Sequence, residues 1–80
     1  MVNELLSNLD KLHTTELGVI RIKKNISLED VDVVKWCKEK IDDPKSIITR
    51  KGKNWYIQID NDIITVNAHS YTIITAHKVK

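Results

Sequence analysis

Several residue types are scarce in this sequence, and each scarcity excludes a class of protein. The single cysteine, Cys37, excludes an internal disulfide and fits a reducing compartment. No apolar run approaches the ~20 residues that a membrane-spanning helix needs, because Asp, Glu or Lys interrupts each one. Residues 1–12 include Glu4 and Asp10 and therefore lack the continuous apolar core of a signal peptide. We expect a cytoplasmic protein with no membrane segment.

Motifs for metals, nucleotides and cofactors are also missing. The two glycines form no glycine-rich phosphate loop, and the three histidines and the cysteine lack zinc-ligand spacing. Glu29, Asp30 and Asp32 form an acidic group, but their place in the first turn of an expected helix explains them through the helix dipole. We expect no metal and no cofactor.

Charge is unevenly divided along the chain, although the net charge is only +2. Residues 1–44 hold seven Lys or Arg against nine Asp or Glu, a net of −2, whereas residues 45–80 hold six against two, a net of +4. The basic residues of the second half are compatible with phosphate, with an acidic protein surface, or with a solvated rim that protects strand edges. Lys45, Arg50, Lys51, Lys53, Lys78 and Lys80 make up this set.

Residues 1–43 have the apolar spacing of helices. Asn3 is the expected N-cap of the first helix, and Thr14 or Thr15 that of the second, which Asn25 ends. Gly18 is expected to allow close approach of the first helix. The predicted buried positions are Leu5, Leu6, Leu9 and Leu12 in the first helix and Leu17, Val19, Ile20 and Ile22 in the second.

The third helix has the clearest local signal. Ser27 is its predicted N-cap, Asp30 completes a variant capping box, and Ile26 and Val31 occupy the positions of a hydrophobic staple. Pro44 ends it, since the residue before proline resists helical geometry. Its expected core stripe is Leu28, Val31, Val34, Cys37 and Ile41, with Trp36 on the flank.

The second half of the chain predicts four strands. They cover 45–50, 54–59, 63–67 and 71–77, and short polar turns separate them. Trp55, Ile57 and Ile59 should face one way, and Tyr56 and Gln58 the other. Consecutive hairpins imply an α+β fold, in which three N-terminal helices pack on one face of a four-stranded antiparallel meander. We expect one domain over 1–80, with a helical part at 1–43 and the sheet at 45–78.

Candidate functional residues lie mainly in the sheet. A metal-independent ribonuclease needs an acid or base, a cation and a positioning hydroxyl; His77, Arg50, Lys51, Thr75 and Tyr71 supply these types. Nothing in their spacing fixes a common geometry, so whether the protein is an enzyme stays open. For binding to nucleic acid or a partner protein, the candidates are Arg50, Lys51, Lys53, Tyr56, His69, Lys78 and Lys80.

Three segments carry a family resemblance: Leu12 to Asn25, Asp32 to Ile41 and Lys51 to Lys78. Together they resemble a family of small bacterial proteins that is defined only as a domain of unknown function. In architecture the chain also resembles small bacterial ribonuclease toxins, whose helices precede an antiparallel sheet with a last strand similar to TIITAH. That second resemblance implicates Arg50, Lys51, Thr75 and His77.

Three functions therefore compete. The first is a non-enzymatic module, of bacterial or mobile-element origin, that docks on a nucleic-acid-handling protein and inhibits it as anti-CRISPR proteins do. The second is an endoribonuclease of the toxin type, and the third is a direct nucleic-acid binder that uses the basic sheet half. We expect a protein partner, leave nucleic acid and a homodimer open, and expect no membrane association.

Overall fold

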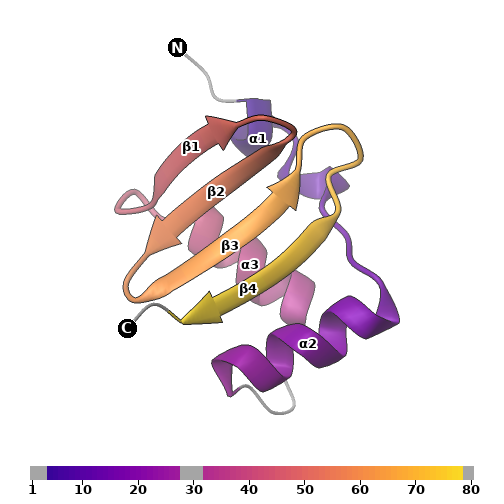
Figure 1. Cartoon of the computed structure of the whole chain (residues 1–80). Helices are drawn as coiled ribbons and strands as arrows, with labels where there is room; N and C mark the ends of the chain where they lie inside the picture. Colours follow the sequence, from indigo (N-terminus) through magenta and orange to yellow (C-terminus); the bar gives the residue numbers. More distant parts are fainter. Residues whose placement is uncertain (1–3, 28–31, 79–80) are drawn as a thin grey trace.

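The structure is a computed structural model, and it describes residues 4–27 and 32–78. The described residues form three α-helices, one short 3-10 helix and then four strands (Figure 1). No helix among them is long and apolar enough to cross a membrane. The elements are α1 (Glu4–Ser7), η1 (Leu9–Lys11), α2 (Glu16–Ile26), α3 (Val33–Ile41), β1 (Ile47–Lys51), β2 (Asn54–Ile59), β3 (Asp62–Asn67) and β4 (Ile73–Lys78).

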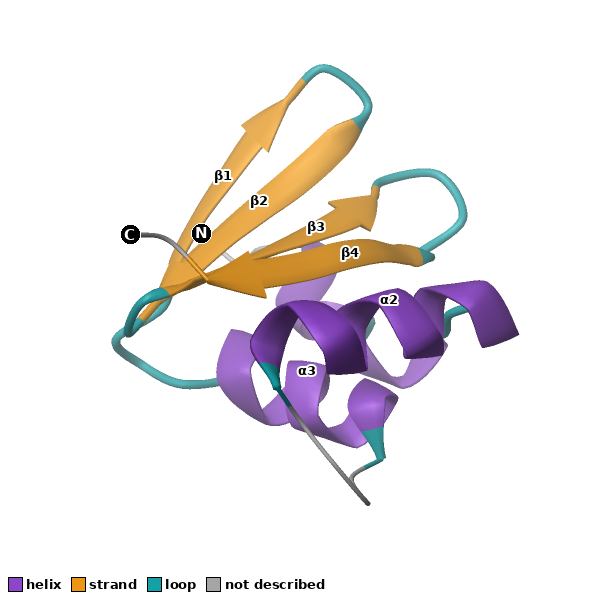
Figure 2. Ribbon diagram, turned by 60° about the horizontal axis from the view of Figure 1, so that its bottom comes forward, coloured by secondary structure: helices purple, strands orange, loops and turns teal. Residues whose placement is uncertain are grey.

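The four strands form one antiparallel sheet in the order β1-β2-β3-β4. The helices lie on one side of this sheet and leave its other face open (Figure 2). The predicted α+β meander is thus confirmed. The register of the last hairpin, which the sequence leaves undetermined, contains an irregularity at Thr65 and Val66.

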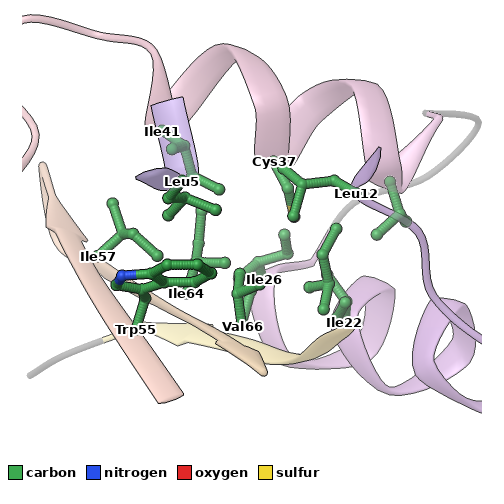
Figure 3. Packing of buried hydrophobic residues seen from close by; sticks show 13 residues of the cluster. Leu5, Leu12, Ile22, Ile26, Cys37, Ile41, Trp55, Ile57, Ile64 and Val66 are labelled. Atoms are coloured by element: carbon green, nitrogen blue, oxygen red, sulfur yellow. The ribbon is translucent and has the colours of Figure 1, made fainter. Parts of the chain in front are cut away.

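The core lies between the helices and the covered face of the sheet (Figure 3). Strand β2 alternates strictly: Trp55, Ile57 and Ile59 are buried, whereas Tyr56 and Gln58 are exposed, as the sequence predicts. The helices contribute buried side chains from several turns, and burial of each large apolar side chain is worth roughly 1.5–3 kcal/mol. The other principal core residues are Leu5, Leu12, Ile22, Ile26, Val33, Cys37, Ile41, Ile64, Val66, Ile73 and Ala76.

The N-terminal helix is shorter than the sequence predicts, because α1 stops at Ser7 and η1 takes over from Leu9. Leu5 and Leu6 are neighbours in α1 and so point in different directions: Leu5 is fully buried, whereas Leu6 is 40% exposed. The prediction that Leu6 belongs to the core is therefore wrong. Asn3, the predicted cap, lies outside the described residues.

Helix α2 begins where expected, because the Thr15 hydroxyl accepts a hydrogen bond from the Gly18 amide at 3.0 Å. Its buried stripe, however, runs through Gly18, Ile22 and Ile26. This stripe follows the i, i+4 spacing and points toward the sheet, so Leu17 and Ile20 turn outward, 65% and 61% exposed. Their predicted burial is wrong.

The sequence predicts that Gly18 allows close approach of the first helix. In the structure, Gly18 instead leaves room for the neighbouring Thr14. A Cβ atom on Gly18 would collide with the Thr14 hydroxyl oxygen. That hydroxyl donates a hydrogen bond to the Ile73 carbonyl of β4 at 2.8 Å. The glycine therefore preserves a link between the start of α2 and the sheet.

Helix α3 begins later than predicted, with Asp32 as its N-cap. The Asp32 carboxylate accepts a hydrogen bond from the Lys35 amide at 3.1 Å. Ser27 instead ends α2 in the left-handed conformation, with φ of 57°, so its predicted role as cap of α3 is wrong. The predicted capping-box and core partners Leu28, Asp30 and Val31 lie outside the described residues.

The strand ends also differ from the sequence prediction. Lys51 and Asp62 belong to strands, so the first two turns are tighter than expected. Gly52 (φ 62°) and Asp60 (φ 55°) adopt the left-handed backbone that two-residue hairpin turns require. Tyr71 does so too, at φ of 58°, and β4 therefore begins only at Ile73.

Replacing Gly18 by Ala should lower the free energy of unfolding by about 1 kcal/mol, measured by urea denaturation. Alanine favours a helix by up to about 1 kcal/mol, but its Cβ displaces the Thr14 hydroxyl from the Ile73 carbonyl. In a Thr14→Ala background the clash is absent, and Gly18→Ala should then be stabilising. If Gly18→Ala changed the free energy of unfolding equally in the wild-type and the Thr14→Ala backgrounds, this explanation would be contradicted.

Two substitutions separate the roles of Ser27 and Asp32. Asp32→Ala should lower the free energy of unfolding by about 1 kcal/mol, because the Lys35 amide loses its cap. Ser27→Gly should raise it by up to about 1 kcal/mol, because glycine adopts positive φ without penalty. If Ser27 capped α3, Ser27→Gly would instead be destabilising in thermal and urea unfolding.

Candidate functional site

The open face of the sheet presents side chains from β1, β2 and β3. Directly paired residues of an antiparallel sheet share a face, and Thr49 pairs with Tyr56 while Ile47 pairs with Gln58. These positions alternate with the buried residues of β2 and therefore lie on the opposite face of the sheet. The helices cover only the face of the buried residues (Figure 2). Ile47 is 62% exposed and Tyr56 37% exposed. Two large side chains with apolar surface thus lie on a face that none of the described helices covers.

A groove of about 540 Å³ lies on this face. Its walls combine aliphatic and aromatic groups with amide, hydroxyl and ammonium groups. Such a mixture is typical of sites that bind another molecule. We call it the β1 groove; its lining is Ile47, Thr49, Lys51, Gly52, Tyr56, Gln58 and Ile63.

Sequence reasoning identified only Lys51 and Tyr56 of the β1 groove as functional. Ile47 and Ile63 look like core residues by composition, and Thr49 and Gln58 carry no motif. The available signal was the alternation in β2, which assigns Tyr56 and Gln58 to the face opposite Trp55. Extending that alternation across the strand pairs requires the register, which the sequence does not fix.

The predicted binding residues gather mainly at one end of the sheet. The turns β1–β2 and β3–β4 meet there, because the Ala68 amide donates a hydrogen bond to the Lys53 carbonyl at 2.8 Å. His69 sits in the second turn, held by a hydrogen bond from its amide to the Asn67 side-chain oxygen at 2.9 Å. We call this region the basic end; its exposed cations and histidine are Arg50, Lys51, Lys53 and His69.

An aromatic pair flanked by two cations closes the core at the basic end. The Trp55 and Tyr71 ring centroids are 5.5 Å apart. The Arg50 guanidinium lies 5.4 Å from the Trp55 centroid, and the Lys11 ammonium lies 5.6 Å from that of Tyr71. Such cation–π contacts favour the cations at these positions. Arg50 therefore covers the core, with its Nε donating to the Gly52 carbonyl at 3.0 Å.

The five candidate catalytic residues do not converge. Arg50 shares the covered face with Trp55, whereas His77 pairs with Ile63 and shares the open face. Lys51 is on the open face, but it stands three strands and four residues away from His77, roughly 20 Å between Cα atoms for ordinary strand dimensions.

Thr75 and Tyr71 have structural partners of their own. The Thr75 hydroxyl accepts a hydrogen bond from the Asn25 amide of α2 at 3.3 Å, and Tyr71 packs on Trp55. Arg50 and Tyr71 meet at a common residue, the buried Trp55.

The other polar residues at the edges of the sheet fasten the fold. The His13 ring contacts the Lys11 carbonyl at 2.9 Å and the Thr72 hydroxyl at 3.1 Å, on opposite nitrogens. Lys78 is exposed at the far end of β4, opposite Asp62 in register. Lys80 lies outside the described residues.

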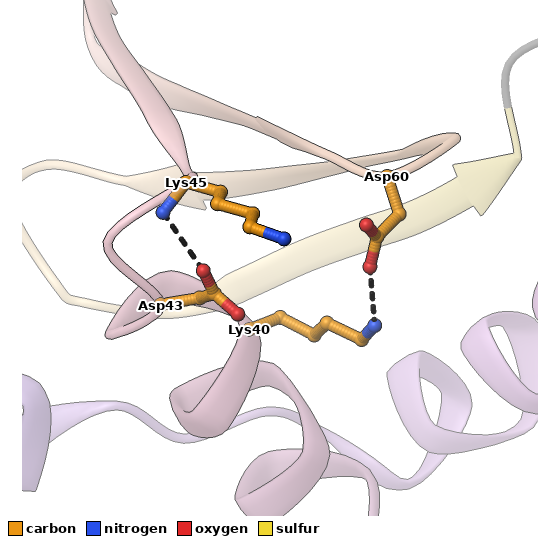
Figure 4. A network of polar contacts seen from close by, with 4 residues as sticks. All are labelled: Lys40, Asp43, Lys45 and Asp60. Carbon is orange, nitrogen blue, oxygen red and sulfur yellow. Dashed lines mark hydrogen bonds and ion pairs between the residues drawn. The ribbon is translucent and has the colours of Figure 1, made fainter.

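The end of the sheet opposite the basic end is tied to α3 (Figure 4). Lys40 forms an ion pair with Asp60 of the β2–β3 turn at 3.0 Å, and the hydrogen bond to Asp60 raises the pKa of Lys40. The Asp43 carboxylate accepts a hydrogen bond from the Lys45 amide at 2.8 Å, which shapes the approach to β1. These acidic groups have local partners.

Neither a nucleophilic thiol nor a metal centre stands out. Cys37 is buried, and burial raises the pKa of its thiol to about 12, so it is protonated at neutral pH. Among residues 4–27 and 32–78 no group of three or more His, Cys, Asp or Glu could hold a metal ion. Of the predicted acidic cluster only Asp32 is described, and it caps α3.

Comparison with known proteins gives one match. No curated protein and no solved structure matches the chain. A family model described as "Protein of unknown function (DUF3781)" matches residues 6–77, which is nearly the whole chain. This agrees with the resemblance in Leu12 to Asn25, Asp32 to Ile41 and Lys51 to Lys78, while no comparison supports the resemblance to ribonuclease toxins. The chain belongs to the DUF3781 family of proteins of unknown function.

Proposed function

We propose that this protein is a non-enzymatic binding module that docks on a partner protein through the open face of its sheet. The observation that carries the proposal is the β1 groove, where the exposed Ile47 and Tyr56 stand beside Lys51. Exposed aromatic and aliphatic side chains that gather on one face are typical of surfaces that recognise another protein. The reduced, buried Cys37 fits a cytoplasmic site of action.

The dispersal of the reactive residues favours binding over catalysis. A general base, a cation and a hydroxyl must reach one substrate atom to share a reaction. His77 and Arg50 lie on opposite faces of the sheet, and Thr75 is bonded to α2. A site that used both His77 and Arg50 would need them on one face, which this strand register does not provide.

The partner that we propose is a nucleic-acid-handling protein, which the module inhibits. Enzymes that transfer phosphoryl groups hold Mg²⁺ with carboxylates, so their active sites present acidic groups. The basic end, with Lys51, Lys53 and His69, has the opposite charge and stands next to the β1 groove. Electrostatic attraction of this kind guides a protein to its partner.

Direct nucleic-acid binding is the second candidate, and it is favoured by the cations beside Tyr56. Binding of single strands relies on several aromatic platforms that stack on successive bases. Trp55 cannot serve as one, because it is only 4% exposed. Tyr56 is therefore the single aromatic side chain available on the described open face, and we rank this function below protein docking.

Photo-cross-linking from the open face tests the proposal. A benzophenone amino acid at Tyr56 should cross-link to one protein in bacterial cells, because this position lines the β1 groove. The same probe at Leu17, exposed on α2, should give no such product. The products are read by mass spectrometry after nuclease digestion.

The function requires more than a cross-link. The captured partner should lose nucleic-acid binding or cleavage when wild-type protein is added, and Tyr56→Ala should weaken this inhibition at least tenfold, while Leu17→Ala leaves it unchanged. Circular dichroism confirms that both variants are folded. A cross-link only to RNA, or one only from position 17, would refute protein docking through this face.

A further inference from the structure

The two edges of the sheet differ in a way that points to a second element of the docking surface. At the β4 edge, the Ile73 amide donates to the His13 carbonyl at 2.7 Å and the His13 amide donates to the Tyr71 carbonyl at 3.2 Å. His13 thus forms a parallel bridge with Thr72, and α2 packs along β4 (Figure 1). The start of the β4 edge therefore has backbone partners, and α2 lies beside the strand.

The β1 edge is free among the described residues, since β1 pairs only with β2. In an antiparallel ladder, the backbone groups of alternate residues point toward the partner strand and away from it. The two-residue turn after Lys51 makes Lys51 and Asn54 the closing pair, so Lys51, Thr49 and Ile47 bond to β2. The backbone N–H and C=O groups of Ile48 and Arg50 therefore point outward. They form a template for a further strand.

The charge around the β1 edge determines which kind of additional strand can bind there. Residues 45–58 hold Lys45, Arg50, Lys51 and Lys53 and no acidic residue. A second copy is a poor occupant, because antiparallel pairing of two β1 strands would bring two sets of four cations together. Repulsion between like charges opposes such an association. An acidic segment is the complementary occupant.

The β1 groove adds places for side chains beside this edge. Ile47 and Thr49 of β1 line it from the edge strand, and Tyr56 and Ile63 lie further in. In strand addition the backbone supplies affinity and pockets for alternate side chains supply specificity. Nucleic acid lacks a backbone donor and acceptor pattern that matches a strand edge, so the free edge favours a polypeptide.

From the free edge, the charge and the groove, we propose that β1 binds an extended acidic peptide segment of a partner protein as an additional β-strand. Its outward backbone groups pair with Ile48 and Arg50, its carboxylates meet Lys51 and Lys53, and an apolar side chain enters the β1 groove. The inference rests on the proposed function, because it specifies which part of a partner the open face receives.

The test uses an acidic peptide of the repeat Glu-Thr-Val-Thr, which sets Glu and Val on the same face of a strand, added to isotope-labelled protein and followed by NMR. The amide signals of Ile48 and Arg50 should shift, and both amides should gain protection from hydrogen exchange, because a new strand bonds to them. A peptide with N-methyl groups on alternate backbone amides should bind at least tenfold more weakly. A peptide in which Lys replaces Glu should not bind.

Charge reversal provides the matched control. Lys51→Glu with Lys53→Glu should weaken binding of the acidic peptide at least tenfold. Lys24→Glu with Lys35→Glu, exposed on α2 and α3, changes the net charge equally and should leave binding unchanged. Unfolding curves establish that both double variants are folded.

Each alternative outcome would overturn the inference. N-methylation without effect would exclude strand pairing, and equal losses in both double variants would mean unspecific attraction. A single-stranded RNA oligonucleotide that shifts Ile48 and Arg50 more strongly than the peptide would assign the edge to nucleic acid. Sedimentation of the free protein as a dimer with both amides protected would assign it to a second copy. If the acidic peptide does not bind at the β1 edge but a protein still cross-links to position 56, the strand inference is wrong and the proposed docking function is retained.

Discussion

The structure depends on one constraint: the helices of the described residues cover one face of the four-stranded sheet and leave the other open (Figure 2). Two helices of moderate length, α2 and α3, together with the short α1 supply the apolar side chains that bury Trp55, Ile57 and Ile64. All three pack on the same side of the sheet, so the side chains that alternate with the buried residues of β2 have no covering layer among the described residues. Ile47 and Tyr56 are exposed for this reason.

The same constraint explains why polar groups occupy the ends of the sheet. With one layer of helices, the core is open at both ends, and each end has its own closure. At one end Lys40 joins α3 to Asp60, and at the other Arg50 covers the Trp55 ring. Arg50 is therefore committed to the core, which leaves Lys51 and Lys53 as the cations of the β1–β2 hairpin that are free to meet a partner.

How much the sequence could predict follows from the range of the interactions concerned. The alternation in Trp55 to Ile59 and the polar turns are local signals, and they predict the meander and the faces of β2 correctly. Which side of α2 is buried depends on where β4 lies, so the apolar Leu17 and Ile20 could not be distinguished from Ile22 by type. The cap of α3 was misassigned because Ser27 and Asp32 are both good caps, and only the path of the chain decides between them.

The candidate site shows the same difference between local features, which the sequence predicts, and features that depend on long-range packing. Tyr56 and Lys51 were accessible to sequence reasoning, because one alternates with buried residues and the other lies at a basic turn. The β1 groove was not, because Ile47 and Ile63 become neighbours of Tyr56 and Gln58 only through the pairing of three strands. The free edge of β1 was equally hidden, since it depends on which strand is outermost. A surface assembled by strand register leaves no contiguous motif in the sequence, so small binding modules of this kind have to be recognised from their exposed faces and edges.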